Sequence, residues 1–160
     1  MRKTEKEITD INEKLAVLKK CKVCRLALSE NNRPYVVPLN YGFDFKDNVL
    51  SLYFHGAPEG KKIDIIKKNN LACFEVDCDT QLMESENPCN FNYAFKSIIG
   101  TGKIFFLEAE NEKSEGLNRI MQHQTDKESD YNFTGKMMGN LVVYKMIIEE
   151  FSGKQKVIPL

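Results

Sequence analysis

The ten residues 53–62, which read YFHGAPEGKK, contain the groups needed to bind an anion. They predict a strand end, a turn through Gly56 and Gly60, and a helix that begins with Lys61 and Lys62. A helix start offers unpaired backbone N–H groups and the positive end of the helix dipole, to which the lysines add formal charge. The pattern predicts a phosphate site, and an ordinary helix start with a solvated basic face is the alternative. Neither the G-x-G-x-x-G fingerprint nor the G-x-x-x-x-G-K-[ST] loop occurs here.

A proline interrupts the strand-like residues 36–41, which read VVPLNY. Because proline has no backbone N–H, Pro38 indicates an edge strand, a bulge, or backbone that faces something other than a neighbouring strand. A flat ring is one such partner, and free backbone groups there would suit the pyrimidine edge of a flavin. The amide of Asn40 both donates and accepts hydrogen bonds and would add to that edge. An ordinary edge strand is the alternative.

The elements that must position these residues are mostly strands. Apolar and aromatic runs between turn residues predict strands over 23–28, 35–41, 49–55, 71–77, about 97–107 and 141–151. Helical spacing predicts helices over roughly 10–20, 59–68 and from Asn111 onward, whereas residues 80–92 and 126–140 are expected to be loops. In the third strand, alternation places Leu50, Leu52 and Phe54 on one face and Ser51, Tyr53 and His55 on the other. Consecutive strands with few helices favour an antiparallel barrel or sandwich in a single domain, residues 1–160.

Composition narrows the class of protein. The 160 residues carry 23 basic and 23 acidic side chains, so no nucleic-acid partner is expected. No apolar run is long enough for a membrane span and no signal peptide is visible, which favours a cytoplasmic protein. The five cysteines are then expected to be free thiols. Cys21 and Cys24 match C-x-x-C, yet a core role for Cys24 is favoured over a zinc or dithiol site, and no metal is expected.

Six short motifs together resemble one family. They are CRLAL (24–28), PYVVPLNY (34–41), YFHGA (53–57), EGKK (59–62), CFEVD (73–77) and SIIGTG (97–102). In this order they resemble the nitroimidazole-resistance (Nim-like) family, within the pyridoxamine 5'-phosphate oxidase-like flavoproteins with an FMN-binding split barrel. The resemblance extends from about Ile8 to Lys154.

This resemblance implies a mainly β fold, a six-stranded antiparallel split β-barrel with short helices. It also implies a homodimer with flavin mononucleotide (FMN) in two sites at the interface. Lys61 and Lys62 would hold the phosphate, and Ser97 with Ile98 would come from the partner chain. Arg25 would lie nearby, or make a surface ion pair instead. The ring would lie along Val37, Pro38, Leu39, Asn40, Tyr53, Phe54 and His55.

His55 is the candidate catalytic residue, because the family's pocket places a histidine at this strand end beside the flavin. An imidazole titrates near neutral pH and can pass a proton to a reduced substrate. A purely structural hydrogen-bonding role is the alternative. His123 is expected on the surface. The chain ends FSGKQK (151–156) where the true oxidases carry an Arg/His substrate motif, so vitamer oxidation is not expected.

The leading functional hypothesis is an FMN-dependent reductase. It would pass electrons from a reduced nicotinamide or another donor to a small acceptor such as a nitroaromatic. A non-catalytic module that binds flavin, or haem through a histidine, is the second hypothesis. A barrel that has lost its cofactor and acts as a dimeric interaction protein is the third.

Overall fold

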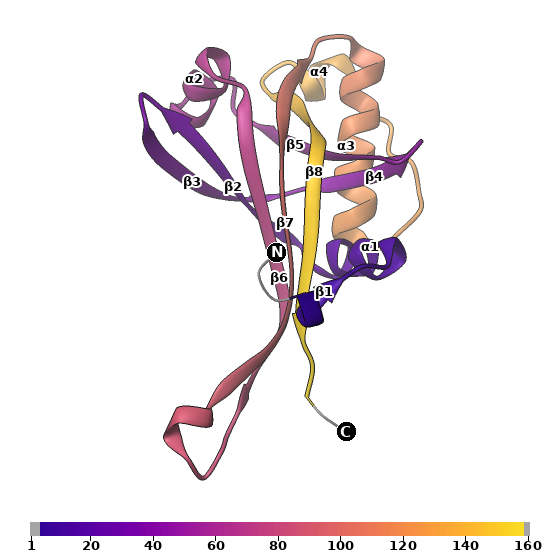
Figure 1. Ribbon diagram of the computed structural model, residues 1–160. Coiled ribbons are helices and arrows are strands. Elements are labelled where there is room, and N and C mark those ends of the chain that lie inside the picture. The colour runs from indigo at the N-terminus through magenta and orange to yellow at the C-terminus, as the bar shows by residue number, and fades with distance from the viewer. Residues whose placement is uncertain (1–3, 159–160) are drawn as a thin grey trace.

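The computed structural model describes residues 4–158, which form one strongly curved antiparallel sheet with helices at its margins (Figure 1). The helices are α1 (Ile11–Lys20), α2 (Lys61–Lys68), α3 (Glu110–Thr125) and α4 (Gly135–Met138), with 3-10 turns at Thr4–Lys6 and Pro88–Asn90. The strands are β1 (Glu7–Ile8), β2 (Val23–Glu30), β3 (Arg33–Asn40), β4 (Gly42–Lys46), β5 (Val49–Gly56), β6 (Leu71–Met83), β7 (Asn92–Leu107) and β8 (Val142–Lys156).

The strand order explains why the sheet closes into a barrel. It runs β3-β2-β6-β7-β8-β5-β4, and β1 pairs with β8. The two ends of this order, β3 and β4, are separated in sequence by Tyr41 alone. The sheet must therefore curl until its first and last strands approach one another. Tyr41 is fully buried at this junction, and its hydroxyl donates a hydrogen bond to the carbonyl of Leu18, 2.7 Å away.

Two tight turns follow directly from the sequence. Asn31 and Asn32 have φ of 51° and 61°, and Asp47 and Asn48 have φ of 51° and 62°. Two consecutive left-handed residues are typical of type I′ hairpin turns, and asparagine and aspartate tolerate this conformation better than other non-glycine residues. The turns join β2 to β3 and β4 to β5 in register.

Strand alternation fills the barrel as predicted. Leu50, Leu52 and Phe54 are almost completely buried inside it. Ser51 and Tyr53 point the other way and are buried as well, because α3 packs against β4 and β5 from outside. The remaining interior includes Cys24, Leu26, Phe74, Val76, Ile98, Tyr144 and Met146.

Helices α1 and α3 attach to this barrel by specific local features. The Asp10 side chain accepts a hydrogen bond from the Glu13 N–H at 2.9 Å, which caps α1. Helix α3 approaches β4 so closely that a Cβ at Gly42 would lie 2.3 Å from the backbone of Arg119. Any larger residue at Gly42 would push the helix away from the sheet.

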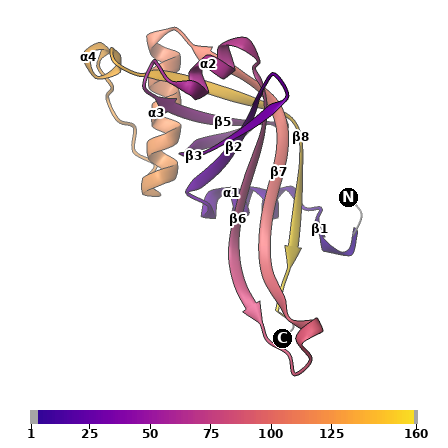
Figure 2. The ribbon, with the colours of Figure 1, turned by 90° about the vertical axis from the view of Figure 1, so that its left-hand side faces the viewer.

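The predicted loop over residues 80–92 is wrong at both ends. Strand β6 continues to Met83 and β7 begins at Asn92, forming a two-stranded ribbon that extends past the barrel (Figures 1 and 2). A register shift between Cys78 and Gln81 separates this ribbon from the rest of the sheet. Its residues are largely exposed on both faces, so no alternation of apolar and polar side chains marks it in the sequence.

Other differences are smaller. Strands β1 and β4 were not predicted, and the expected loop 126–140 includes the short helix α4. No helix within residues 4–158 is long and apolar enough to cross a bilayer.

Candidate functional site

The start of α2 brings together the residues that the sequence predicted for an anion. Strand β5 ends at Gly56, and Gly60, with φ of 124°, allows the turn into the helix. No side chain caps this helix. The carbonyl of Gly60 accepts hydrogen bonds from Ile63 and Asp64, which leaves the N–H groups of Lys61 and Lys62 as free donors at the helix start.

The two lysine side chains rest on different walls of this site. The amine of Lys61 lies 4.8 Å from the ring centre of Tyr35 on β3, a cation–π contact. The amine of Lys62 lies over Gly56, where an added Cβ would be only 2.9 Å from the nitrogen. Neither amine has a hydrogen bond or an ion pair with any residue between 4 and 158. We call Tyr35, His55, Gly56, Lys61 and Lys62 the α2 site.

His55 is exposed at the end of β5. Its strand partner Val143 packs on the α3 side of the sheet, whereas Gly56, beside the Lys62 amine, pairs with Val142 on the barrel side. Partial burial, followed by the positive charge of Lys62, lowers the pKa of His55 below its ordinary value. Both effects favour the neutral imidazole.

Two further predicted residues on β5 face elsewhere. Tyr53 is buried against α3, and its hydroxyl donates a hydrogen bond to the Asp44 carboxylate at 3.0 Å. Phe54 is fully buried in the barrel and stacks on Tyr144 with ring centres 5.4 Å apart. Neither ring is therefore open to a ligand outside the barrel.

Strand β3 is an edge strand, which fits the ordinary reading of Pro38. Val37 and Leu39 pack inward against the core, whereas Pro38 and Asn40 are exposed on the other face. The Asn40 amide nitrogen donates to the Lys22 carbonyl at 3.2 Å and to the Gln124 side chain at 3.0 Å.

The remaining predicted residues lie on β2 and β7. Arg25 makes the surface ion pairs that the sequence left open, at 3.2 Å to Glu75 and 2.6 Å to Asp77. Ser97 pairs with Asp77 in the β6–β7 ladder, and the Ile98 side chain is fully buried in the core. Within one chain, Arg25 and Ser97 thus both neighbour Asp77 on the sheet, and neither lies on β3, β5 or α2.

His123 is buried, which corrects the expectation of a surface residue. Its Nδ1 lies 2.7 Å from the Tyr41 carbonyl and its Nε2 lies 3.1 Å from the Lys19 carbonyl. Burial lowers the pKa of His123, and these hydrogen bonds partly offset that effect. The signal that the sequence offered was Gly42, which lets α3 approach β4 closely enough to bury this face.

Polar neighbours complete the surroundings of His123. The Lys22 amine bonds to the His123 carbonyl at 2.5 Å and to Asp126 at 2.7 Å, and Gln124 donates to the Lys22 and Tyr41 carbonyls. We call Lys22, Asn40, His123, Gln124 and Asp126 the α3 network.

Comparison with known proteins places this geometry in a family. The model of the pyridoxamine 5'-phosphate oxidase family matches residues 10–155 of the chain. The chain belongs to the pyridoxamine 5'-phosphate oxidase family. No curated protein matches it.

Solved structures of similar fold support this assignment. A provisionally assigned 5-nitroimidazole antibiotic resistance protein from Bacteroides thetaiotaomicron is 27% identical, with a TM-score of 0.79, and the match covers 93% of this chain and 86% of that one. A flavocytochrome from Azotobacter vinelandii is 20% identical with a TM-score of 0.79, covering 99% and 73% of the two chains. An FAD- and haem-binding protein from Mycobacterium smegmatis is 14% identical with a TM-score of 0.78, covering 94% and 73%. The predicted split barrel is confirmed, and β1 and β4 are additional to the six predicted strands.

The cysteines of this family member have no metal or disulfide partner among residues 4–158. Cys24 is fully buried in the barrel, as predicted, and burial raises its pKa and that of Cys21 to about 12. Besides burial, Cys78 on β6 raises the pKa of Cys21, and Cys24 is not among the groups that influence it. The C-x-x-C spacing therefore does not bring its two thiols together.

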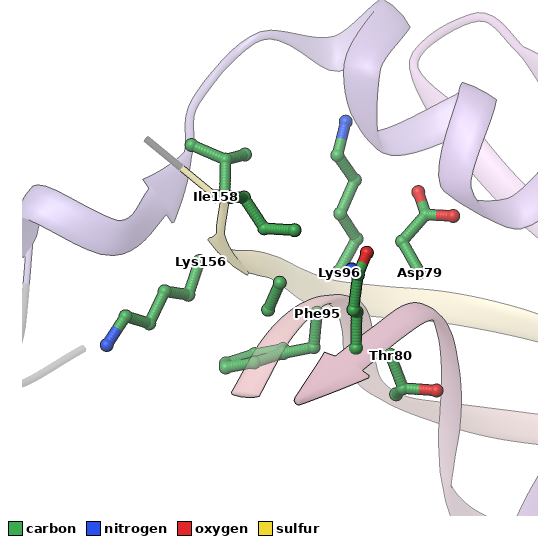
Figure 3. Close-up of a pocket in the computed structure, with 9 residues that line it drawn as sticks. Asp79, Thr80, Phe95, Lys96, Lys156 and Ile158 are labelled. Atoms are coloured by element: carbon green, nitrogen blue, oxygen red, sulfur yellow. The ribbon is translucent and has the colours of Figure 1, made fainter. Parts of the chain in front are cut away.

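A separate hollow of about 370 Å³ lies at the base of the ribbon (Figure 3). It contains none of the predicted site residues. Phe95, Val157 and Ile158 give it apolar walls, and Lys96 and Lys156 give it positive charge. The family comparison assigns no ligand to it.

Proposed function

We propose that this chain is a flavoprotein that binds FMN with its phosphate at the start of α2. The supporting observation is that the amines of Lys61 and Lys62 and two helix N–H groups lie at the start of α2 with no hydrogen bond or ion pair among residues 4–158. By contrast, the Lys68 amine at the other end of the same helix is already paired with Glu30 at 2.6 Å. Unpaired donors at a helix start suit a phosphate monoester.

The strands beside α2 also offer a place for the flavin ring. In the proposal, the ring lies along the edge strand β3 at Val37, Pro38, Leu39 and Asn40. The strand end at Tyr53, Phe54 and His55 forms the second side. Because β3 is an edge strand, the backbone groups on its outer side are not used by another strand and are open to the ring.

The homodimer is part of the same proposal. The outer face of the sheet exposes Leu71 on β6 and Ile99 and Phe105 on β7 at 54%, 49% and 45%. Exposed apolar residues on one sheet face favour a second copy as partner. In that arrangement Ser97 and the backbone of Ile98 would belong to the site of the opposite chain, and Arg25, paired with Glu75 and Asp77, would lie nearby.

The proposed activity is reduction of a small acceptor such as a nitroaromatic. Bound FMN would supply the electron-transfer chemistry, drawing on a reduced nicotinamide or another donor. The residues of the chain would hold the phosphate, order the ring and keep water from its inner face. His55 would hold or deliver a proton at its imidazole, next to the reacting ring.

A spectroscopic titration tests the proposal. The purified protein is titrated with FMN, and flavin absorption and fluorescence are followed to saturation. One FMN per chain, followed by reduction of a nitroaromatic with reduced nicotinamide, is the expected result. A Soret band, or no flavin uptake, would reject it.

A further inference from the structure

We propose that the hollow at the base of the ribbon binds a small aromatic carboxylate, with its ring against Phe95 and Ile158 and its carboxylate at Lys156. The hollow has a volume of about 370 Å³, which is within the usual range of small-molecule sites. Its lining includes none of the residues assigned to the flavin. The inference is therefore independent of the proposed function.

The hollow lies where the pairing of β6 with β7 is interrupted. The register of the two strands shifts between Cys78 and Gln81, so that Asp79 and Thr80 together stand opposite Phe95 and form a β-bulge. The backbone of Asp79 has φ of 58°, in the left-handed region that residues with a side chain rarely adopt. A bulge bends its strand and disrupts the ladder, and the hollow lies against this one.

One part of the hollow is apolar. Val157 and Ile158 follow the end of β8 and are 61% and 46% exposed, although both side chains are large and apolar. The half-buried Phe95 of β7 lines the same hollow (Figure 3). A bound ring would remove this apolar surface from water, which is favourable in proportion to the area covered. The wall therefore suits the apolar body of a ligand.

The charge of the hollow is positive. Asp79 is the acidic residue in its lining, and it is already paired with Lys20 of α1. The amines of Lys96 and Lys156 form no ion pair within residues 4–158, and the two side chains point in different directions (Figure 3). Lys156 pairs with Phe95 in the β7–β8 register, so these two side chains share one face of the sheet. An unpaired amine thus lies beside the apolar wall.

These features together define the class of ligand. An apolar wall beside an unpaired amine suits a molecule that has a ring and a negative charge. Lys154 adds positive charge on the same face, because its amine lies 5.8 Å from the ring centre of Phe95. Thr80 and Gln81 line the hollow as well and offer a hydroxyl and an amide as hydrogen-bond donors. A cation would be repelled here.

Fluorescence titration with 2-naphthoate is the test, and 2-naphthamide is the neutral probe of the same shape. We expect both probes to saturate one site per chain. The carboxylate should bind about 3–5-fold more tightly than the amide, which is the size of one solvent-exposed ion pair. In NMR spectra, both probes should shift the methyl signals of Val157 and Ile158. Equal affinities of the two probes would overturn the inference.

Matched variants identify the residues responsible. Lys156→Met should remove most of the preference for the carboxylate, whereas Lys67→Met, at an exposed lysine of α2, should retain it. Ile158→Ser should weaken both probes about 3–5-fold because part of the apolar wall is lost. Its stability should not change, because Ile158 is exposed and lies beyond β8. A preference that survives Lys156→Met in full would overturn the inference.

FMN separates this inference from the proposed function. FMN should leave the affinity for 2-naphthoate unchanged. Competition between the two would assign the hollow to the flavin site and overturn the inference of a separate site. If no flavin binds but the preference for 2-naphthoate holds, the proposed function fails and the inference stands. Absence of saturable binding would leave the hollow to another occupant, such as a second copy of the chain, and would overturn the inference.

Discussion

The α2 site and the α3 network contain similar residues but differ in whether their polar groups have partners within the chain. Each has a histidine and at least one lysine where a strand end meets a helix. In the α3 network the Lys22 amine, the Asn40 amide and both His123 nitrogens have partners within the chain. In the α2 site the amines of Lys61 and Lys62 contact a ring and a glycine and form no ion pair within residues 4–158.

This difference separates stability from binding. Buried polar groups that satisfy one another stabilise the fold, because removing one leaves its partners without a hydrogen bond. Charges that remain unpaired contribute little to stability and are available to a ligand. His123, the buried member of the α3 network, therefore holds α3 against α1 and the β3–β4 junction, whereas the α2 site is proposed to bind.

The largest expected effect comes from His123→Ala. It removes a buried ring together with the hydrogen bond of that ring to a backbone carbonyl, while Gln124 still donates to the Tyr41 carbonyl, so unfolding free energy should fall by about 2–4 kcal/mol. Urea unfolding measures the loss. His55→Ala, the matched change at the exposed histidine, should stay within about 0.5 kcal/mol of the parent. Equal losses of unfolding free energy in the two variants would show that the two histidines contribute equally to stability, against this comparison.

The next effect concerns the proposed ligand. The double variant Lys61→Ala/Lys62→Ala should weaken FMN binding about 10–100-fold, because charge-assisted hydrogen bonds to the phosphate are lost. Riboflavin affinity and thermal stability should be unchanged. Fluorescence titration measures both flavins, with Lys67→Ala as control. Equal weakening of FMN and riboflavin would place the phosphate elsewhere.

A smaller effect is expected at Tyr35. Tyr35→Leu removes the ring under the Lys61 amine and should weaken FMN binding about 2–5-fold, the size of an exposed cation–π contact. Tyr35→Phe keeps the ring and should bind as the parent does. A loss shared by both variants would point to the hydroxyl instead.

The smallest expected effect is a pH dependence of stability. Since burial lowers the pKa of His123 in the folded chain, the unfolded chain binds a proton more readily. Stability should therefore be full above the ordinary histidine pKa and fall as the pH is lowered through it. Urea midpoints measured across this range in the parent and in His123→Gln check the sign. A variant with the same pH dependence as the parent would assign it to other groups.

Much of the barrel could be predicted from local patterns. Along β5, Leu50, Leu52 and Phe54 alternate with Ser51 and Tyr53. The Asn31-Asn32 and Asp47-Asn48 pairs mark the turns of the β2–β3 and β4–β5 hairpins. The ribbon was missed because two exposed strands carry no alternation. His123 was misplaced because its burial depends on how closely α3 approaches Gly42, 81 positions earlier in the chain.

The sequence by itself determined the strands of the barrel, their turns and the basic helix start, because these depend on neighbouring residues. Only the tertiary structure decided which polar groups are already paired. Lys22, Asn40 and His123 are far apart in sequence and meet at the closure of the barrel, where they form hydrogen bonds within the chain. Lys61 and Lys62 come to an edge where β3 and the end of β5 bring a tyrosine and a glycine to their amines, and no carboxylate among residues 4–158 forms an ion pair with them.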